Sequence, residues 1–279
     1  MASRISEDLA ATIHRYAEVA NMVNRREMTR FIQDVRQRWH PEPLEDWEPP
    51  RPEGYTDEGA FNLCVYELAF GGREPHRDGE LCEAEFKNEV LLRSTDDLVD
   101  LIPKPCTDPA PQSEVQERLH TLRGLLQEQL NQPPATDGMA IQLPKDFEEL
   151  VSLTNGINGA GVPSETAYTE LIRPLDQHYT NADMLKRISR WVVFRSYALL
   201  AAWELGGCVQ HRRIYYVLCH KTSTEQPALA SWRVFDQDDV SVDTYESLAV
   251  FLQHETNFVE ERPGGAKQKH VIQDLNYPI

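Results

Sequence analysis

Several stretches of this 279-residue chain contain residue types that could bind a ligand, and the first to test is the glycine cluster GINGAG at 156–161. A phosphate-binding loop follows a strand and opens a helix, so that backbone N–H groups face the anion. Here an amphipathic helix is predicted before the glycines, so carbonyl groups point toward them instead. The spacing G-x-x-G-x-G also differs from the dinucleotide-binding pattern. We therefore interpret the cluster as the end of a helix followed by a turn.

The helix before these glycines is predicted to begin near Pro144, because proline suits the first helical position. Its apolar face has the i, i+3, i+4, i+7 spacing of a helix and comprises Phe147, Leu150, Val151 and Thr154. Asn155 and Gly156 follow, and these residue types are typical of a left-handed helix cap. We therefore expect a positive φ at Gly156.

Cysteine and histidine lie close together at Cys208 and His211, and again at Cys219 and His220. A structural zinc site needs four ligands that converge. Cys219 and His220 are adjacent in a predicted strand, so their side chains should point to opposite faces. At most three of the four could converge, and we predict a buried cysteine and an exposed histidine rather than a metal centre.

Four aspartates are predicted to share one loop: Asp236, Asp238, Asp239 and Asp243. A calcium loop needs alternating oxygen ligands, a glycine and a terminal glutamate at fixed positions, and the glycine is missing here. Two interpretations stay open. The loop is either a solvated acidic turn or an acidic surface that meets a basic partner.

Common catalytic motifs of the types G-x-S-x-G, H-E-x-x-H and the kinase signature do not occur in the sequence. We therefore expect no cofactor and no enzymatic activity. The rival hypothesis is an enzyme whose site lies between the N-terminal part and the sheet. Trp203 and Trp232 lie on neighbouring predicted strands, where core packing is expected rather than a ligand platform.

Composition limits the class of partner. The formal net charge is −17, with 41% hydrophobic and 26% charged residues. A packed core is feasible, while nucleic acid and anionic membranes, which select basic surfaces, are disfavoured. The charge suits a basic protein partner or serves solubility alone. The five sparse cysteines, with no signal peptide and no membrane-spanning run in the sequence, predict a cytoplasmic location, with the nucleus as the alternative.

The N-terminal part, residues 1–110, is predicted to be mainly helical and to contain a proline-rich linker at 41–58. Helices are expected over 6–40, 60–70 and 80–101, with a strand as the alternative for 60–70. After a second proline cluster, Ser113 is predicted to open a helix through a capping box with Gln116. The apolar stripe of that helix comprises Val115, Leu119, Leu122, Leu126 and Leu130.

After Gly161 the sequence changes to short runs rich in β-branched and aromatic residues. Strands are predicted near 190–196, 198–205, 212–219 and 230–236, followed by a helix near 244–257 and a tail at 261–279. The short connections favour antiparallel pairing. The expected fold class is α+β, an antiparallel sheet with flanking helices, preceded by a mainly helical N-terminal region.

This order of elements resembles the SUKH superfamily, which includes the fungal Smi/Knr cell-wall-assembly regulators and bacterial toxin-immunity proteins. The matching residues are Leu143, Pro144, Asp146, Phe147, Leu150, Leu153, Asn155 and Gly156, with weaker matches at 203–207, 214–216, 232–236 and 251–252. The resemblance covers 111–260 and leaves 1–110 unassigned. It implies an α+β domain that binds proteins and has no known catalysis.

The sequence therefore favours a non-enzymatic protein-binding module, either a regulatory scaffold or a toxin-neutralising, immunity-like protein. Its binding surface is expected at Asp236, Asp238, Asp239, Asp243, Glu204, Asn155 and Gly156. The partner is expected to be a protein, and a basic one would suit the net charge. If the acids serve solubility alone, the aromatic residues Trp39, Trp47 and Tyr55 around the proline-rich segment are the alternative interface.

Overall fold

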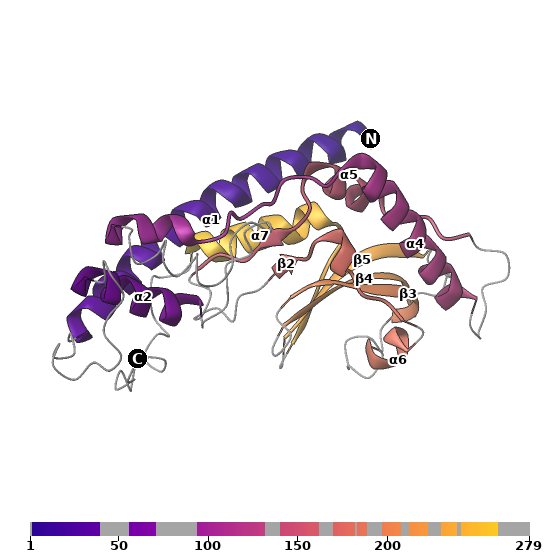
Figure 1. Ribbon diagram of the computed structural model, residues 1–279. Coiled ribbons are helices and arrows are strands. Elements are labelled where there is room, and N and C mark those ends of the chain that lie inside the picture. The colour runs from indigo at the N-terminus through magenta and orange to yellow at the C-terminus, as the bar shows by residue number, and fades with distance from the viewer. Residues whose placement is uncertain are drawn as a thin grey trace. The chain divides into compact units, whose positions relative to one another are not determined.

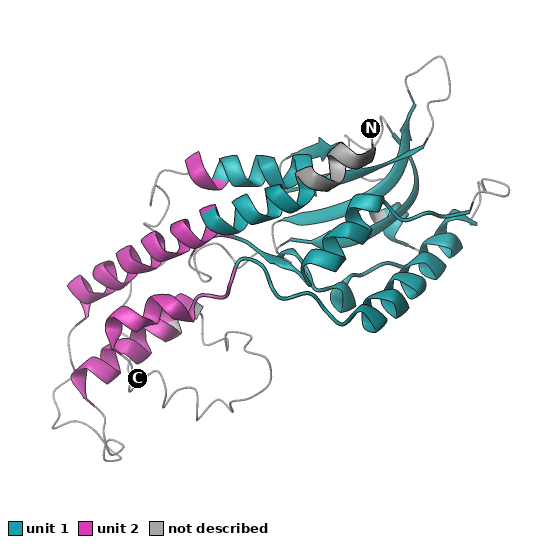
Figure 2. Cartoon of the chain, turned by 90° about the horizontal axis from the view of Figure 1, so that it is seen from above, with its two compact units in different colours: residues 1–18, 105–159, 169–258 teal, residues 19–104, 160–168, 259–279 magenta. Residues whose placement is uncertain are grey.

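Helices and antiparallel strands together give the chain the α+β class expected from its sequence (Figure 1). The computed structural model describes residues 2–39, 56–70, 94–131, 140–161, 170–181, 183–188, 197–207, 212–222, 230–238 and 241–261. The chain divides into two compact units (Figure 2). Unit 1 comprises residues 1–18, 105–159 and 169–258, and unit 2 comprises residues 19–104, 160–168 and 259–279.

These units do not follow the boundary expected at residue 110. Residues 105–107 belong to unit 1, because their backbone groups form hydrogen bonds with residues 156–158. The N–H of Asn158 donates to the carbonyl of Pro105 at 2.7 Å, and the N–H of Thr107 donates to that of Gly156 at 3.2 Å. The N-terminal end of helix α1 (Ala2–Arg38) also belongs to unit 1, where the buried Tyr16 donates its O–H to the carbonyl of Asn158.

Unit 1 contains a four-stranded antiparallel sheet in the order β3-β4-β5-β6, and Figure 1 labels β3, β4 and β5 of this sheet. The strands are β3 (Tyr197–Gly206), β4 (Arg213–Lys221), β5 (Ser231–Gln237) and β6 (Val242–Tyr245). Antiparallel pairing is confirmed for the three predicted strands that are described, whereas β6 was not predicted and 190–196 lies outside the described residues. A second, two-stranded sheet pairs β1 (Ile157–Asn158) with β2 (Glu170–Ile172).

Both faces of the four-stranded sheet pack against helices of unit 1. On one face the rings of Trp203 and Tyr216 stack at 4.9 Å, and Phe147 of helix α5 (Lys145–Leu153) meets Trp203 edge-on at 5.0 Å. On the other face, helix α6 (Met184–Ile188) contributes to a core that includes Met184, Ile188, Tyr215, Val217 and Phe235. The core position expected for Trp203 is therefore confirmed, because none of its surface is exposed.

Helix α4 (Gln112–Leu130) buries its whole predicted stripe, Val115, Leu119, Leu122, Leu126 and Leu130. The predicted capping box is wrong, because the helix begins at Gln112 and no side chain caps its first turn. Pro111 precedes the helix as its N-cap and Ser113 already lies inside it. A side chain cannot cap from within the first turn, since a capping oxygen must come from the residue that flanks the helix.

Helix α5 follows the expected spacing, with Pro144 as its N-cap and Phe147, Leu150 and Val151 buried. Gly156 has the expected positive φ, +139°. It does not cap the helix, however, because α5 already ends at Leu153 with an extended Thr154 as its C-cap. The glycine serves close packing instead, since a Cβ there would lie 3.1 Å from the carbonyl oxygen of Ile172.

Helix α7 (Leu248–Glu261) begins four residues later than the predicted 244, because Val242–Tyr245 forms strand β6. The carboxylate of Asp146 fixes its first turn by accepting the backbone N–H of Leu248 at 3.0 Å. The same carboxylate accepts the hydroxyl of Tyr216 at 2.8 Å. Asp146 thus connects α5, the sheet and the start of α7.

Unit 2 packs the later part of α1 against helix α2 (Asp57–Phe70) and the 3₁₀ helix η2 (Thr95–Leu101). Its core is apolar and includes Met28, Phe31, Val35, Phe61, Val65 and Leu98. The helical interpretation of 60–70 is confirmed over the strand alternative. Of the predicted helix 80–101, the part before residue 94 lies outside the described residues, and the part after it is η2.

Trp39 packs edge-on against Phe61 in unit 2, at 5.4 Å, whereas Trp47 and Tyr55 lie outside the described residues. In the part of the chain that the structure describes, every helix is too short or too polar to cross a membrane.

Candidate functional site

The predicted acidic loop is instead a β-hairpin, made by β5 and β6. Asp236 lies in β5 and Asp243 lies directly opposite it in β6. Asp238 is exposed at the end of β5, and its carboxylate accepts the backbone N–H of Ser241 at 2.5 Å. Asp239 lies outside the described residues. The expectation of a single loop is wrong because β-pairing continues through Val242–Tyr245.

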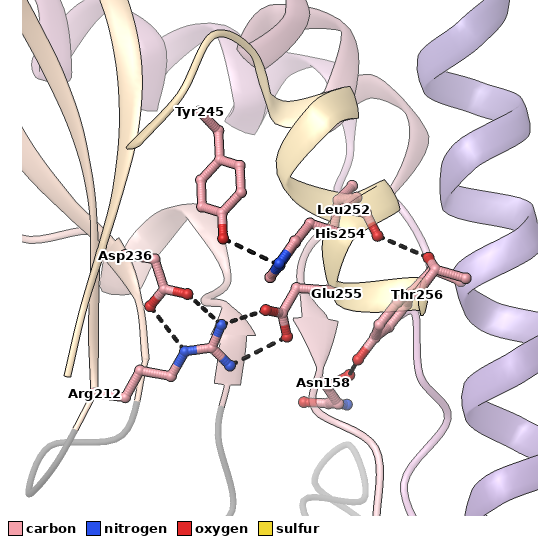
Figure 3. Close-up of polar contacts among 9 residues, drawn as sticks. Asn158, Arg212, Asp236, Tyr245, Leu252, His254, Glu255 and Thr256 are labelled. Carbon is pink, nitrogen blue, oxygen red and sulfur yellow. Dashed lines mark hydrogen bonds and ion pairs between the residues drawn. The ribbon is translucent and has the colours of Figure 1, made fainter. Parts of the chain in front are cut away.

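Asp236 binds Arg212, which precedes β4. The guanidinium Nε and Nη2 of Arg212 donate to the two carboxylate oxygens of Asp236 at 2.9 and 2.5 Å. Nη1 and Nη2 donate to Glu255 of helix α7 at 3.1 and 2.5 Å. Figure 3 shows the guanidinium between the two carboxylates. Such forked, charge-assisted bonds fix orientation as well as adding energy.

The Arg212 cluster, defined as Arg212, Asp236 and Glu255, is mostly buried, with side-chain exposures of 23%, 13% and 7%. Burial alone would disfavour the charge on Arg212. Hydrogen bonds to Asp236 and the charge of Glu255 outweigh that effect and raise the pKa of the guanidinium. Arg212 therefore holds its charge in the folded protein. Asp236 is a structural acid and not the exposed partner-binding acid that the sequence suggested.

Tyr245 lies beside this cluster, and its hydroxyl is 3.0 Å from Nδ1 of His254 (Figure 3). Burial, and after it the carboxylates of Asp236, Asp243 and Glu255, raise the pKa of Tyr245. The hydroxyl therefore keeps its proton and can donate to His254. A neutral tyrosine surrounded by acids is a stable hydrogen-bond donor and a poor nucleophile or base.

Glu204 is also buried, with 5% of its surface exposed. Its carboxylate pairs with Arg173 at 2.9 Å and with Arg213 at 3.1 Å. A carboxylate held between two arginines inside the fold is neutralised before any partner arrives. We therefore remove Glu204 from the predicted binding surface.

Asn155 and Gly156 have structural roles as well. The side-chain oxygen of Asn155 accepts the backbone N–H of Leu175 at 3.2 Å. Gly156 is buried, and its carbonyl accepts the N–H of Thr107. The structure therefore places both residues between segments of unit 1, far along the chain from the acidic hairpin.

Comparisons of the chain with protein-family models, with curated proteins and with solved structures gave no match. The SUKH assignment stays a prediction that rests on the residues of the Leu-Pro…Asn-Gly segment and on the order of the elements.

The cysteine and histidine pairs do not come together as ligands among the described residues. Cys219 is buried, as predicted, and burial raises the pKa of its thiol to about 11. His220 is half-exposed on the same strand. Cys208 and His211 lie outside the described residues. The described part of the chain contains no group of three or more metal-ligating side chains.

Sequence reasoning missed Arg212 and Glu255, which bind the predicted acid Asp236. They lie 43 residues apart in sequence, and neither belongs to a motif. One signal was available. Glu255 is four residues from Phe251 and three from Leu252, so helical spacing puts it on the buried face of α7. A carboxylate on a buried face needs a cation, and the nearby sequence offers Arg212 and Arg213 as candidates.

Proposed function

We propose that this chain is a non-enzymatic protein-binding module of the SUKH type that holds a basic protein partner at the β5–β6 hairpin. The observation that supports this proposal most directly is the position of Asp243. It is exposed on β6, whereas the buried acids Asp236, Glu255 and Glu204 already have arginine partners. Glu246 follows β6 with 81% of its side chain exposed. Among the described residues Asp243 has no arginine partner, and Glu246 meets Arg233 only at 3.9 Å, so both acids are presented to solvent.

The charge of the whole chain supports this proposal. With a net charge of −17, the protein attracts a basic partner over long distances and repels nucleic acid and anionic membranes. Either a regulatory scaffold or a toxin-neutralising protein would use this attraction, and a cytoplasmic location suits both. The SUKH resemblance supports protein binding rather than catalysis, since its members bind proteins.

The test begins with affinity capture of partners from the cytosol of the native source, followed by association kinetics with the purified partner. We expect association to slow as ionic strength rises, because exposed charges are screened. Asp243→Lys should slow association several-fold at low ionic strength. Asp108→Lys is the matched control, because Asp108 is an exposed loop residue outside the hairpin. An association rate that does not respond to salt or to Asp243→Lys contradicts the proposal.

A further inference from the structure

The two edges of the four-stranded sheet differ in how their backbone groups are satisfied. At β3, Ala202 directs its N–H and C=O away from β4, and the side chain of Gln129 binds both groups. Oε1 of Gln129 accepts the N–H at 2.8 Å, and Nε2 donates to the carbonyl at 3.1 Å. Next along the strand, the N–H of Glu204 donates to the carbonyl of Tyr179 at 2.8 Å. From Ala202 to the end of β3, this edge is covered by other segments of the chain.

The opposite edge, β6, pairs with β5 on one side and with no described residue on the other. The N–H of Asp238 donates to the carbonyl of Ser241, so these two residues form a hydrogen-bonded pair. Such pairs alternate along an antiparallel ladder. Asp243 and Tyr245 therefore direct their backbone groups toward β5, and Val242 and Thr244 direct theirs away from it. The outward N–H and C=O groups of Val242 and Thr244 can form hydrogen bonds with an extended chain that pairs with this edge as a further strand.

The side chains of β6 specify which extended chain fits. Asp243 shares one face of the sheet with Asp236 and Tyr245, because paired residues and every second residue point the same way. Val242 lies on the other face, packed against the core that contains Phe235. In an added strand, alternate side chains would lie beside Asp243 and the others beside Val242. The first set should be basic and the second apolar.

We propose that the β6 edge binds an extended segment of alternating basic and apolar residues as a fifth, antiparallel strand. This inference rests on the proposed function, because the segment belongs to the basic protein partner. A second copy of this chain is a poorer occupant, since pairing β6 with β6 would bring the Asp243 carboxylates of the two copies together. Strand β6 offers an added strand only the backbone groups of Val242 and Thr244. The basic side chains of the added segment therefore supply the specificity.

The test uses the full chain and the synthetic peptide acetyl-Lys-Val-Lys-Val-Lys-Val-amide. A lysine opposite Asp243 forms a non-hydrogen-bonded pair, so the lysine N–H groups point away from β6 and the valine N–H groups point toward it. N-methylation of the valines should therefore abolish binding, whereas N-methylation of the lysines should be tolerated. The two modified peptides have the same charge and composition, so their difference reports backbone pairing alone. Equal affinities, a reversed preference, or no binding of the unmodified peptide at low ionic strength would overturn the inference.

Thr244→Pro gives an independent measurement on the protein side. Proline removes the N–H of Thr244, and a sheet tolerates it on an edge strand where that group faces away from the neighbouring strand. We expect about a tenfold loss of affinity for the unmodified peptide, which corresponds to one hydrogen bond. Unchanged affinity in the folded variant would also overturn the inference. If the variant does not fold, the affinities of the two N-methylated peptides for the unaltered chain still test the inference. If the peptide results fail while partner association still slows with Asp243→Lys, the proposed function survives without the strand addition.

Discussion

Arg212 and Glu255 hold helix α7 to the sheet through two hydrogen bonds, at 3.1 and 2.5 Å. Arg212→Gln would leave the carboxylates of Asp236 and Glu255 facing each other without a cation. Removing one partner of a buried ion pair typically costs about 3–5 kcal/mol, because the remaining charge stays uncompensated. We expect a loss of that size in the free energy of unfolding, measured by urea titration.

Arg233→Gln is the control for this experiment. Arg233 also lies on the sheet, but it meets the largely exposed Glu246 at 3.9 Å. An exposed pair of this kind contributes at most about 1 kcal/mol. A loss at Arg212 no larger than the loss at Arg233 would show that the Arg212 cluster does not stabilise the fold.

Gly156 is the second position at which a small change should have a large effect. Gly156→Ala forces a side chain into a backbone conformation with a φ of +139° and to 3.1 Å from the carbonyl oxygen of Ile172. Strain of this kind costs about 1–3 kcal/mol. Gly124→Ala is the matched control, because Gly124 is helical and a Cβ there has nothing within 4 Å. That control should gain about 0.5–1 kcal/mol. Thermal unfolding of both variants tests whether Gly156→Ala lowers stability while Gly124→Ala raises it. Unchanged stability of Gly156→Ala would contradict the predicted backbone strain.

The parts of this fold that the sequence predicts are those with a local cause. The stripe of α4 and the positive φ of Gly156 follow from residue spacing and from the conformational range of glycine. Strand β6 was missed because it is four residues long and contains an aspartate, a residue depleted in strands, next to a turn signal. Its pairing with β5 decides its conformation.

The candidate site was predicted less well, because the sequence shows where acids are and not what neutralises them. Glu204 bonds to Arg173, 31 residues away, and Asp236 bonds to Arg212, 24 residues away. Neither spacing belongs to a local pattern. Among the predicted acids that the structure describes, Asp243 and Asp238 are exposed, and Asp238 also holds the turn through Ser241. Asp243 is therefore the acid to test.

His178 should make stability depend on pH. Its Nε2 donates to the carbonyl of Arg173 at 2.9 Å, while Nδ1 is buried without a hydrogen-bond partner among the described residues. Burial lowers the pKa of His178 to about 4, below the ordinary value of 6.5. Between these values the unfolded chain binds a proton that the folded chain does not. Stability from this residue is therefore complete above about pH 6.5 and falls as the pH drops toward about 4.

The measurement is the free energy of unfolding across this pH range for the unaltered chain and for His178→Gln. Glutamine can donate to the Arg173 carbonyl but does not titrate, so the variant should lose less stability between about pH 6.5 and about pH 4. His120→Gln is the control, because His120 is exposed on α4. Parallel pH curves for the unaltered chain and His178→Gln would contradict the buried, neutral histidine.

Asp243 should be an acid that costs stability. It lies directly opposite Asp236 in the β5–β6 ladder, and like charges in that position destabilise a sheet. Asp243→Asn keeps the size of the side chain and removes the repulsion, so we expect the isolated protein to gain about 0.2–1 kcal/mol. Asp108→Asn removes one charge from an exposed loop and corrects for the general repulsion of a chain with a net charge of −17. A gain at Asp243 beyond that control, together with slower association of the same variant with its partner, would mean that the acid is kept for binding at the expense of stability. A variant that is less stable than the control would place Asp243 in the same structural class as Asp236, and the binding surface would then have to lie elsewhere.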